Sequence, residues 1–462
     1  MVTRVSIART VSCEQGGALV AVLAIVLVLT VLLGVAAAMH VARYRFVRRD
    51  VHRVQARYLA EAGVYTAMDS LQRDPRWRVL DAPLSLPGCD RCEVTVAGYG
   101  AFLLVRSVAV RAGSRYTARA IIGETPPPAF RSAIYLWDSQ SSLNVAGTTY
   151  IRGDIVVGER GLVESTFKGR RFEGRVEGSV TESAETRPAF LDLHQFEEAT
   201  STFERWLRAP DVSATPEPRS YLPAHHLPSD NRIWHVSGDL MLDATDQSHF
   251  TMPITVAATG RLVVEGPLHL SPGTVLAAGE ELVIHGEVTG REGLYYGRRG
   301  VDIGPGVRLA GQVFSPAAIR VHGDAYMHEP SVLFVSGAAA SQGGGIVLED
   351  SVVVDGTVVH APVEPLPVDH RGRVTVQAGA RVRGAIYNAL ETELHGVLAG
   401  SLVGYQLFFY ETPTNYVNWL RDATVDAEAR PVTFALPVGF SDAPRFVVIA
   451  WEGHIEDVDA AA

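Results

Sequence analysis

The sequence predicts a membrane-anchored α+β protein, in which a long N-terminal transmembrane and amphipathic helix precedes a small antiparallel sheet and a mainly-β parallel β-helix, or solenoid. Three observations predict this class: an uncharged apolar run near the N-terminus, three short strand-like runs after it, and a degenerate repeat over most of the remaining chain. The net charge of −10 leaves no extended basic face, so we expect no nucleic acid as a partner.

The apolar run extends from Gly17 to Met39, which is 23 residues without a charge. At about 1.5 Å per residue, a helix of this length crosses a hydrocarbon layer of about 30 Å. A secretory signal peptide has a shorter apolar stretch that is followed by a small-residue cleavage site. The run therefore predicts a single-pass anchor, with the lipid bilayer as its partner and the rest of the chain in water.

The helix continues beyond the apolar run and forms one unit over residues 17–74, because apolar side chains recur at alternating steps of three and four. Arginines occupy the rest of the surface of this segment. Asp74 precedes a proline and is a plausible helix end. The positions expected to pack are Tyr44, Val47, Val51, Val54 and Tyr58, continued by Ala62, Tyr65 and Met68. The arginines are Arg43, Arg45, Arg48, Arg49, Arg53 and Arg57.

Residues 75–123 predict the small sheet. Three runs in this region have strand composition, at 93–97, 102–110 and 116–122, and glycine-containing turns separate them. The following segment, 124–130, contains three consecutive prolines and predicts a stiff extended linker.

Residues 131–404 predict the parallel β-helix, with coils of about 20 residues. Short β-rich runs end repeatedly in an apolar-x-Gly step, and we expect glycine where the chain turns with a positive φ. A run with helical spacing and a Pro-rich tract interrupt the repeat at 181–232, which predicts an insertion between coils. The aromatic-rich segment 405–462 is expected to cap the open end. The repeat glycines are Gly147, Gly153, Gly178, Gly238, Gly266, Gly286, Gly323, Gly337, Gly356, Gly384 and Gly396.

Residues 14–20 (EQGGALV) lead into the apolar run, and residues 58–64 (YLAEAGV) follow it. This N-terminal region resembles the PilX-type minor pilins and pseudopilins of type IV pilus and type II secretion machines. The resemblance implies that prepilin peptidase removes a leader, residues 1–16, between Gly16 and Gly17. It also implies that the partners are other pilins and the inner-membrane assembly machinery, and that the bulk of the chain is periplasmic or extracellular.

Two features depart from the pilin pattern. Most pilins carry a glutamate at mature position five, where this chain has Ala21, and this difference favours a minor or tip subunit. The arginines after the span would, by the positive-inside rule, leave the large domain in the cytoplasm. A membrane-tethered scaffold that faces the cytoplasm, with a solenoid that resembles the bactofilins, is therefore an alternative function.

Cys89 and Cys92 form the only closely spaced cysteine pair. They could close a small disulfide in an oxidising compartment, or remain free thiols. A zinc site would need two further soft ligands that the sequence does not supply nearby, so we expect no metal and no cofactor.

We expect no catalytic residues. His285, His322 and His395 occupy the x of apolar-x-Gly, a position that is Ser, Glu, Asp, Arg or Ala in other coils and should face solvent. No GxSxG, HExxH or phosphate-loop signature occurs. A carbohydrate-active β-helix that uses acidic residues near these histidines, such as Asp302, is a second alternative. A surface glycan or host ligand of the solenoid is a further possible partner that the sequence does not identify.

Overall fold

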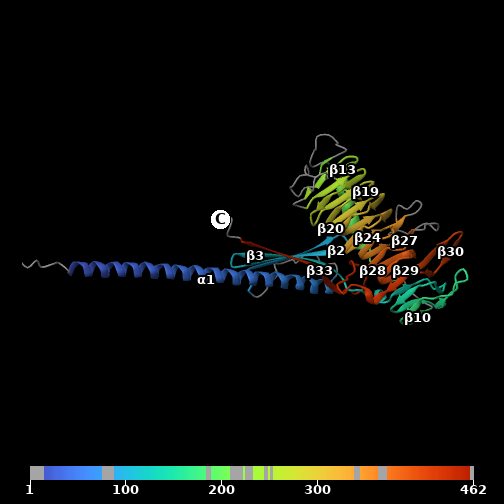
Figure 1. Ribbon diagram of the computed structural model, residues 1–462, viewed down its shortest axis with the longest axis horizontal. Helices are drawn as coiled ribbons and strands as arrows, with labels where there is room; N and C mark the ends of the chain where they lie inside the picture. Colours follow the sequence, from blue (N-terminus) through green and yellow to red (C-terminus); the bar gives the residue numbers. More distant parts are fainter. Residues whose placement is uncertain are drawn as a thin grey trace, which may run out of the picture.

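The computed structural model describes residues 15–74, 88–183, 189–208, 222–223, 233–243, 248–249, 253–337, 344–362 and 372–457. Its first element is α1 (Gln15–Arg73), a continuous helix of 59 residues whose N-terminal part projects away from the rest of the protein (Figure 1). The helix is long and apolar enough to cross a membrane, and none of its most apolar window is buried inside the protein. The expected helix is confirmed, including its end beside Asp74.

A four-stranded antiparallel sheet packs against the second half of α1. The expected strands are β1 (Arg91–Tyr99), β2 (Phe102–Arg111) and β3 (Ser114–Glu124). The fourth strand is β33 (Phe446–Asp457), which comes from the far end of the chain and pairs with β3. The helix residues buried against this sheet are Ala56, Ala60, Val64, Ala67 and Leu71, together with Gly63.

The remaining strands form a large parallel β-solenoid with three columns of stacked strands, as the fold class predicted. The first column stacks β12 (Ile233–Val236), β15 (Thr255–Ala258), β18 (Val275–Ala278), the second halves of β20 (Val288–Gly297), β22 (Arg308–Ser315), β24 (Tyr326–Val335) and β26 (Val353–His360), the middle parts of β28 (Arg381–Leu394) and β29 (Val397–Glu411), and then β4 (Ile134–Leu136), β7 (Ile155–Gly158) and β10 (Val180–Ser183).

The second column stacks β11 (Leu222–Pro223), β13 (Leu240–Asp243), β16 (Leu262–Glu265), β19 (Glu281–His285), β21 (Gly300–Ile303), β23 (Ala318–Val321), β25 (Gly345–Leu348), β27 (Arg373–Val376), the ends of β28 and β29, and then β31 (Trp419–Arg421), β5 (Leu143–Ala146) and β8 (Leu162–Glu164). The third column stacks β14 (Ser248–His249), β17 (Leu268–Leu270), the first halves of the long strands β20, β22, β24, β26, β28 and β29, and then β32 (Thr424–Asp426), β6 (Tyr150–Arg152) and β9 (Arg175–Glu177). A hairpin strand, β30 (Thr414–Val417), pairs with the end of β29.

Ladders of aliphatic side chains fill the inside of the solenoid, and their removal from water stabilises the stack of coils. In the second column, one fully buried ladder contains Val264, Ile284, Ile303, Val321, Leu348 and Val376. Register partners in the first column lie 20 positions apart at Thr255 and Val275, and 28 apart at Thr357 and Ala385. The coil length therefore varies around the expected value because loops of different length leave the corners.

Nine of the eleven repeat glycines have a positive φ, and only Gly266 and Gly396 do not. A column of three glycines shows why the residue is needed. Gly356, Gly384 and Gly400 have φ values of 156°, 150° and 153° and stack in register. A Cβ on Gly384 would run into the carbonyl oxygen of Gly356.

The order of the coils differs from the expected simple progression over 131–404. The chain enters beside β29, since β4 pairs with both β29 and β7, and it builds outward to β10. It then crosses to the opposite end, starts again at β12, and winds back until β29 docks on β4. Segment 181–232 is therefore a crossover along the solenoid rather than an insertion between neighbouring coils. The spacing of the repeat along the sequence indicates how long a coil is, but it does not indicate which coils stack on one another.

Within this crossover, α2 (His194–Arg208) lies across the outer side of the first column. Phe196 stacks on Phe334 with ring centroids 4.5 Å apart, and Phe203 stacks on Tyr296 at 5.0 Å. The helix expected from the spacing of apolar residues is present. Its apolar face is buried because Phe196 and Phe203 pack on the solenoid. Most of the Pro-rich tract, 210–228, lies outside the described residues.

The segment 405–462 is not a single cap. Its first part completes β29 and the last returning coil, and β33 leaves the solenoid to extend the sheet next to α1. Phe446 pairs with Glu124, so the chain enters and leaves the solenoid at adjacent points (Figure 1). The short 3-10 helix η1 (Pro128–Arg131) follows the entry, where an extended linker was expected, and η3 (Ala427–Ala429) follows β32. The solenoid is thus inserted between two strands of the small sheet.

Candidate functional site

The apolar stripe predicted on α1 lies on the protein surface. Exposed fractions are 68% for Tyr44, 54% for Val47, 48% for Val51, 51% for Val54 and 64% for Tyr58. The sheet covers a different face of the helix, which is made mostly of small residues. Among the residues that the structure describes, the five side chains therefore have no extensive packing partner, and their role in packing between subunits stays a prediction.

Further along the stripe, Tyr65 is 63% exposed and stacks on Trp451 of β33 with a centroid distance of 6.4 Å. Trp451 is itself 37% exposed. The last strand of the chain thus adds an aromatic side chain to the apolar surface of α1. Sequence reasoning missed this addition because the two residues are almost 400 positions apart.

The tip of the β1–β2 hairpin is fixed to the solenoid by glutamine side chains. Oε1 of Gln312 accepts a hydrogen bond from the Ala101 amide at 2.6 Å, and its Nε2 donates to the Tyr99 carbonyl at 2.9 Å. Gln195 of α2 donates to the Gly100 carbonyl at 2.9 Å. Because Gln312 and Gln195 are buried, these bonds hold the two parts of the protein in one orientation. No sequence signal marks such isolated glutamines.

A buried carboxylate makes a second connection. Glu124 is 1% exposed and accepts hydrogen bonds from the amides of Gly439 at 2.7 Å and Phe440 at 3.0 Å. Burial raises the pKa of Glu124 to about 7, although the backbone amides act in the opposite direction. The carboxylate joins the end of β3 to the loop before β33, which is the neck between the sheet and the solenoid.

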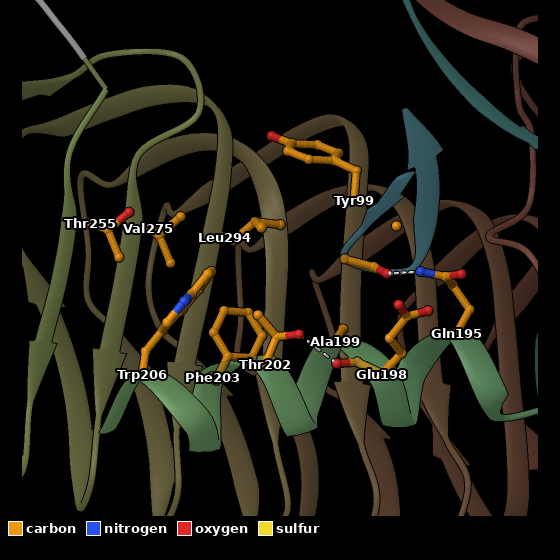
Figure 2. Close-up of a pocket in the computed structure, with 12 residues that line it drawn as sticks. Tyr99, Gln195, Glu198, Ala199, Thr202, Phe203, Trp206, Thr255, Val275 and Leu294 are labelled. Carbon is orange, nitrogen blue, oxygen red and sulfur yellow. Dashed lines mark hydrogen bonds between the residues drawn. The ribbon is translucent and has the colours of Figure 1, made fainter. Parts of the chain in front are cut away.

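A groove of about 330 Å³ lies where the hairpin tip, α2 and the solenoid meet (Figure 2). Tyr99 from the hairpin faces Phe203 and Trp206 from α2 across it, and Val275 and Leu294 of the solenoid contribute apolar side chains. Pockets for small molecules generally combine such an apolar lining with a few polar groups.

The polar groups of the groove are the Glu198 carboxylate and the hydroxyls of Thr202 and Thr255. Glu198 is exposed and has no salt-bridge partner among the residues that the structure describes. The Tyr99 hydroxyl donates to the Glu292 carbonyl, which fixes its ring at one side of the groove.

Cys89 and Cys92 are present as free thiols, half-buried and buried respectively. The two thiols lie within hydrogen-bonding distance of each other. Burial raises the pKa of the Cys92 thiol to about 12. The disulfide therefore stays a prediction. Over the described ranges, no group of three or more His, Cys, Asp or Glu side chains is arranged to hold a metal ion.

The three histidines at apolar-x-Gly positions lie at the surface, with His285 exposed and the others half-buried. His322 bridges two neighbouring coils: its Nε2 lies 3.0 Å from Asp302 and its Nδ1 2.9 Å from Glu349. His395 contacts Glu393 at 3.2 Å. Asp302 thus belongs to a surface ion pair with His322.

Gly16 and Gly17 fall in the first turn of α1, and residues 1–14 of the expected leader lie outside the described part of the chain. The expected processing site therefore remains a prediction.

No family model matches the chain, and no curated protein matches it. Among solved structures, the chain is similar to the competence-associated pilin ComZ from Thermus thermophilus, at 12% identity, over 88% of this chain and 98% of that chain. The TM-score of this match is 0.24.

Proposed function

We propose that this protein is a non-enzymatic, minor pilin-like subunit that is anchored in the inner membrane by α1. In this proposal, prepilin peptidase cleaves between Gly16 and Gly17, and the assembly machinery then packs α1 with the helices of other pilins. The observation that carries it is the apolar stripe from Tyr44 to Tyr58, which continues the apolar span and is left uncovered by the chain's own sheet. Subunit packing would remove it from water.

The attachment and the size of the solenoid support the role of a minor subunit rather than that of a subunit repeated along the filament. It is inserted through a neck at Glu124 and Phe446 and is fixed by Gln312, so it follows the sheet as a rigid body. Together with Ala21, its bulk favours a tip, initiating or adhesive position. Labelling along the whole filament shaft, at a level comparable with a major subunit, would contradict this position.

Site-specific cross-linking tests the packing. In cells, a photoreactive residue at Val47 should cross-link to other pilins, whereas one at the buried Val64 should not. Mass spectrometry of the mature N-terminus tests the processing, with a start at Gly17 expected. An intact Met1 and no cross-link at Val47 would leave only a generic membrane anchor.

The cytoplasmic scaffold is tested separately by a topology reporter. β33 ends near the β2–β3 turn, since Asp457 pairs with Ser114, so a reporter after residue 457 reports the side of the membrane on which the sheet lies. A periplasmic reporter supports the pilin-like subunit, and a cytoplasmic one supports the scaffold.

The groove favours ligand binding as a second function of the same subunit. Its facing aromatic rings, its free carboxylate and its hydroxyls match the chemistry that recognises a sugar ring, so a surface glycan is the ligand we assign. Screening the full chain on a glycan array tests this. Binding that is lost in Trp206→Ala and retained in Trp451→Ala supports the groove, and equal binding by all three proteins contradicts it.

A further inference from the structure

The arginines that follow the membrane span are the feature of the sequence that the pilin-like function does not explain. Two of them are paired along the helix, Arg53 with Asp50 at 3.4 Å and Arg57 with Glu61 at 2.7 Å. Arg45 and Arg48 are exposed, and neither has a salt-bridge partner in the described part of the chain. Uncompensated positive charge thus remains on α1 close to the span.

This charge surrounds a cavity. Between α1 and the β2–β3 turn lies a space of about 300 Å³. The helix contributes Arg45, Arg48, Arg49 and His52 to its lining, and the turn contributes Gly113 and Ser114. The cavity is therefore a basic pocket with one wall of polar backbone.

The turn that closes the cavity is rigid and presents a hydroxyl. Ala112 and Gly113 have φ values of 47° and 82°, as in a two-residue hairpin turn. The Asp90 carboxylate accepts a hydrogen bond of 2.6 Å from the Ala112 amide and forms a salt bridge of 3.1 Å with Arg111. Its negative charge is therefore already paired with Arg111. Ser114 is 3% exposed, and its hydroxyl has no hydrogen-bond partner among the described residues.

The cavity lies at the height of the lipid headgroups if α1 spans the bilayer. Arg45 and Arg48 follow Met39 by six and nine residues, which corresponds to about 9 and 14 Å along the helix. Side chains on a helix lean towards its N-terminus, so both guanidinium groups reach back towards the membrane. The headgroup layer begins where the apolar span ends.

We propose that this cavity binds the phosphate of an anionic phospholipid headgroup. The inference rests on the proposed anchoring of α1 in the bilayer. Arginine forks bind phosphate oxygens with two parallel hydrogen bonds, and the Ser114 hydroxyl donates a third. The site also gives a reason for arginines on the outer side of the span: bound lipid phosphates neutralise them while the subunit waits in the membrane.

The test counts lipids on the purified full chain in detergent by native mass spectrometry, with phosphatidylglycerol and phosphatidylcholine as probes. The expected result is retention of phosphatidylglycerol in preference to phosphatidylcholine. Arg45→Gln and Arg48→Gln should each lower this retention about fivefold. Arg43→Gln is the matched control, because it removes a charge still closer to the span but outside the cavity, and it should change retention less than about twofold.

Three results would overturn the proposal. Equal losses in all three variants would mean diffuse surface charge, and no loss in Arg45→Gln or Arg48→Gln would mean that the cavity is not the site. Displacement of phosphatidylglycerol by millimolar inorganic phosphate would assign the cavity to free phosphate instead of lipid. Cross-linking at Val47 in the same variants keeps the tests separate, because assembly can persist when lipid binding is lost.

Discussion

The side-chain oxygen of Gln312, in the solenoid, accepts a hydrogen bond of 2.6 Å from the main-chain amide of Ala101, at the tip of the β1–β2 hairpin. With the bond from its Nε2 to the Tyr99 carbonyl, one side chain connects the four-stranded sheet to the middle of the solenoid. The solenoid is therefore joined to the sheet at its neck and also at the hairpin tip, and these two attachments hold the solenoid and the sheet in one orientation.

Replacing this glutamine should loosen the connection. Gln312→Ala leaves a buried amide and a buried carbonyl without partners, which should lower the free energy of unfolding by about 2 to 4 kcal/mol. Thermal unfolding and proteolysis at the hairpin measure the loss. Gln377→Ala, at an exposed position, is the control, and an equal effect of both changes would refute the role of Gln312.

The glycine column should not tolerate a side chain. Gly384→Ala places a Cβ against the Gly356 carbonyl at a positive φ, and we expect a loss of about 2 to 4 kcal/mol in stability. Gly238→Ala is the control, because Gly238 also has a positive φ but would place its Cβ in open space. Chemical denaturation compares the two variants, and the first should be clearly less stable.

Glu124 should make stability depend on pH. Because its folded pKa is raised from 4.5 to about 7, its contribution is fully present below pH 4.5 and is lost as the pH rises through 7. Glu124→Gln does not ionise, so its unfolding temperature relative to the natural protein should rise between pH 4.5 and pH 7.5. A difference that stays constant across this range would show that folding does not raise the pKa of Glu124.

His322 should stabilise the solenoid in its protonated form. Both ring nitrogens face carboxylates, so both must donate, and this requires the imidazolium. Burial lowers the pKa of His322, but hydrogen bonds to Glu349 and Asp302 outweigh that effect and raise it above 6.5. The contribution of His322 to the stability of the folded protein is thus fully present below pH 6.5, and it is lost as the pH rises through the raised pKa of His322.

The matching measurement compares unfolding temperatures of the natural protein and His322→Gln at pH 5.5 and pH 8. The substitution should destabilise more at pH 5.5. His285→Gln, which removes an exposed histidine, controls for general effects of histidine removal. An identical loss at both values of pH would rule out the protonated bridge.

The cysteine pair should differ in reactivity when reduced. Burial raises the pKa of Cys92 to about 12, so this thiol should resist alkylation at pH 8 until the protein unfolds, whereas the half-buried Cys89 should react earlier. Peptide mass spectrometry follows both labels. In protein isolated from an oxidising compartment, protection of both residues that is removed by a reductant would establish the predicted disulfide.

Local patterns along the chain were enough to predict the individual helices, strands and turns. The uncharged run from Gly17 and the heptad-like spacing after it specified α1, since helix length and periodicity are local properties. The β-rich runs of the small sheet and the repeat glycines specified strands and turns in the same way, because a strand period and a positive φ are set within a few residues.

The neighbours of each element, in contrast, became known from the folded structure and not from local patterns. Nothing local distinguishes β33 from a capping strand, yet it pairs with β3 and brings Trp451 to Tyr65. Strands with the same apolar pattern can stack in many orders, so the return of the last coil to β4 could not be read from spacing. The groove around Tyr99 and the basic cavity beside Arg45 arise from the same long-range contacts, in which each partner is an ordinary surface residue until the fold brings them together.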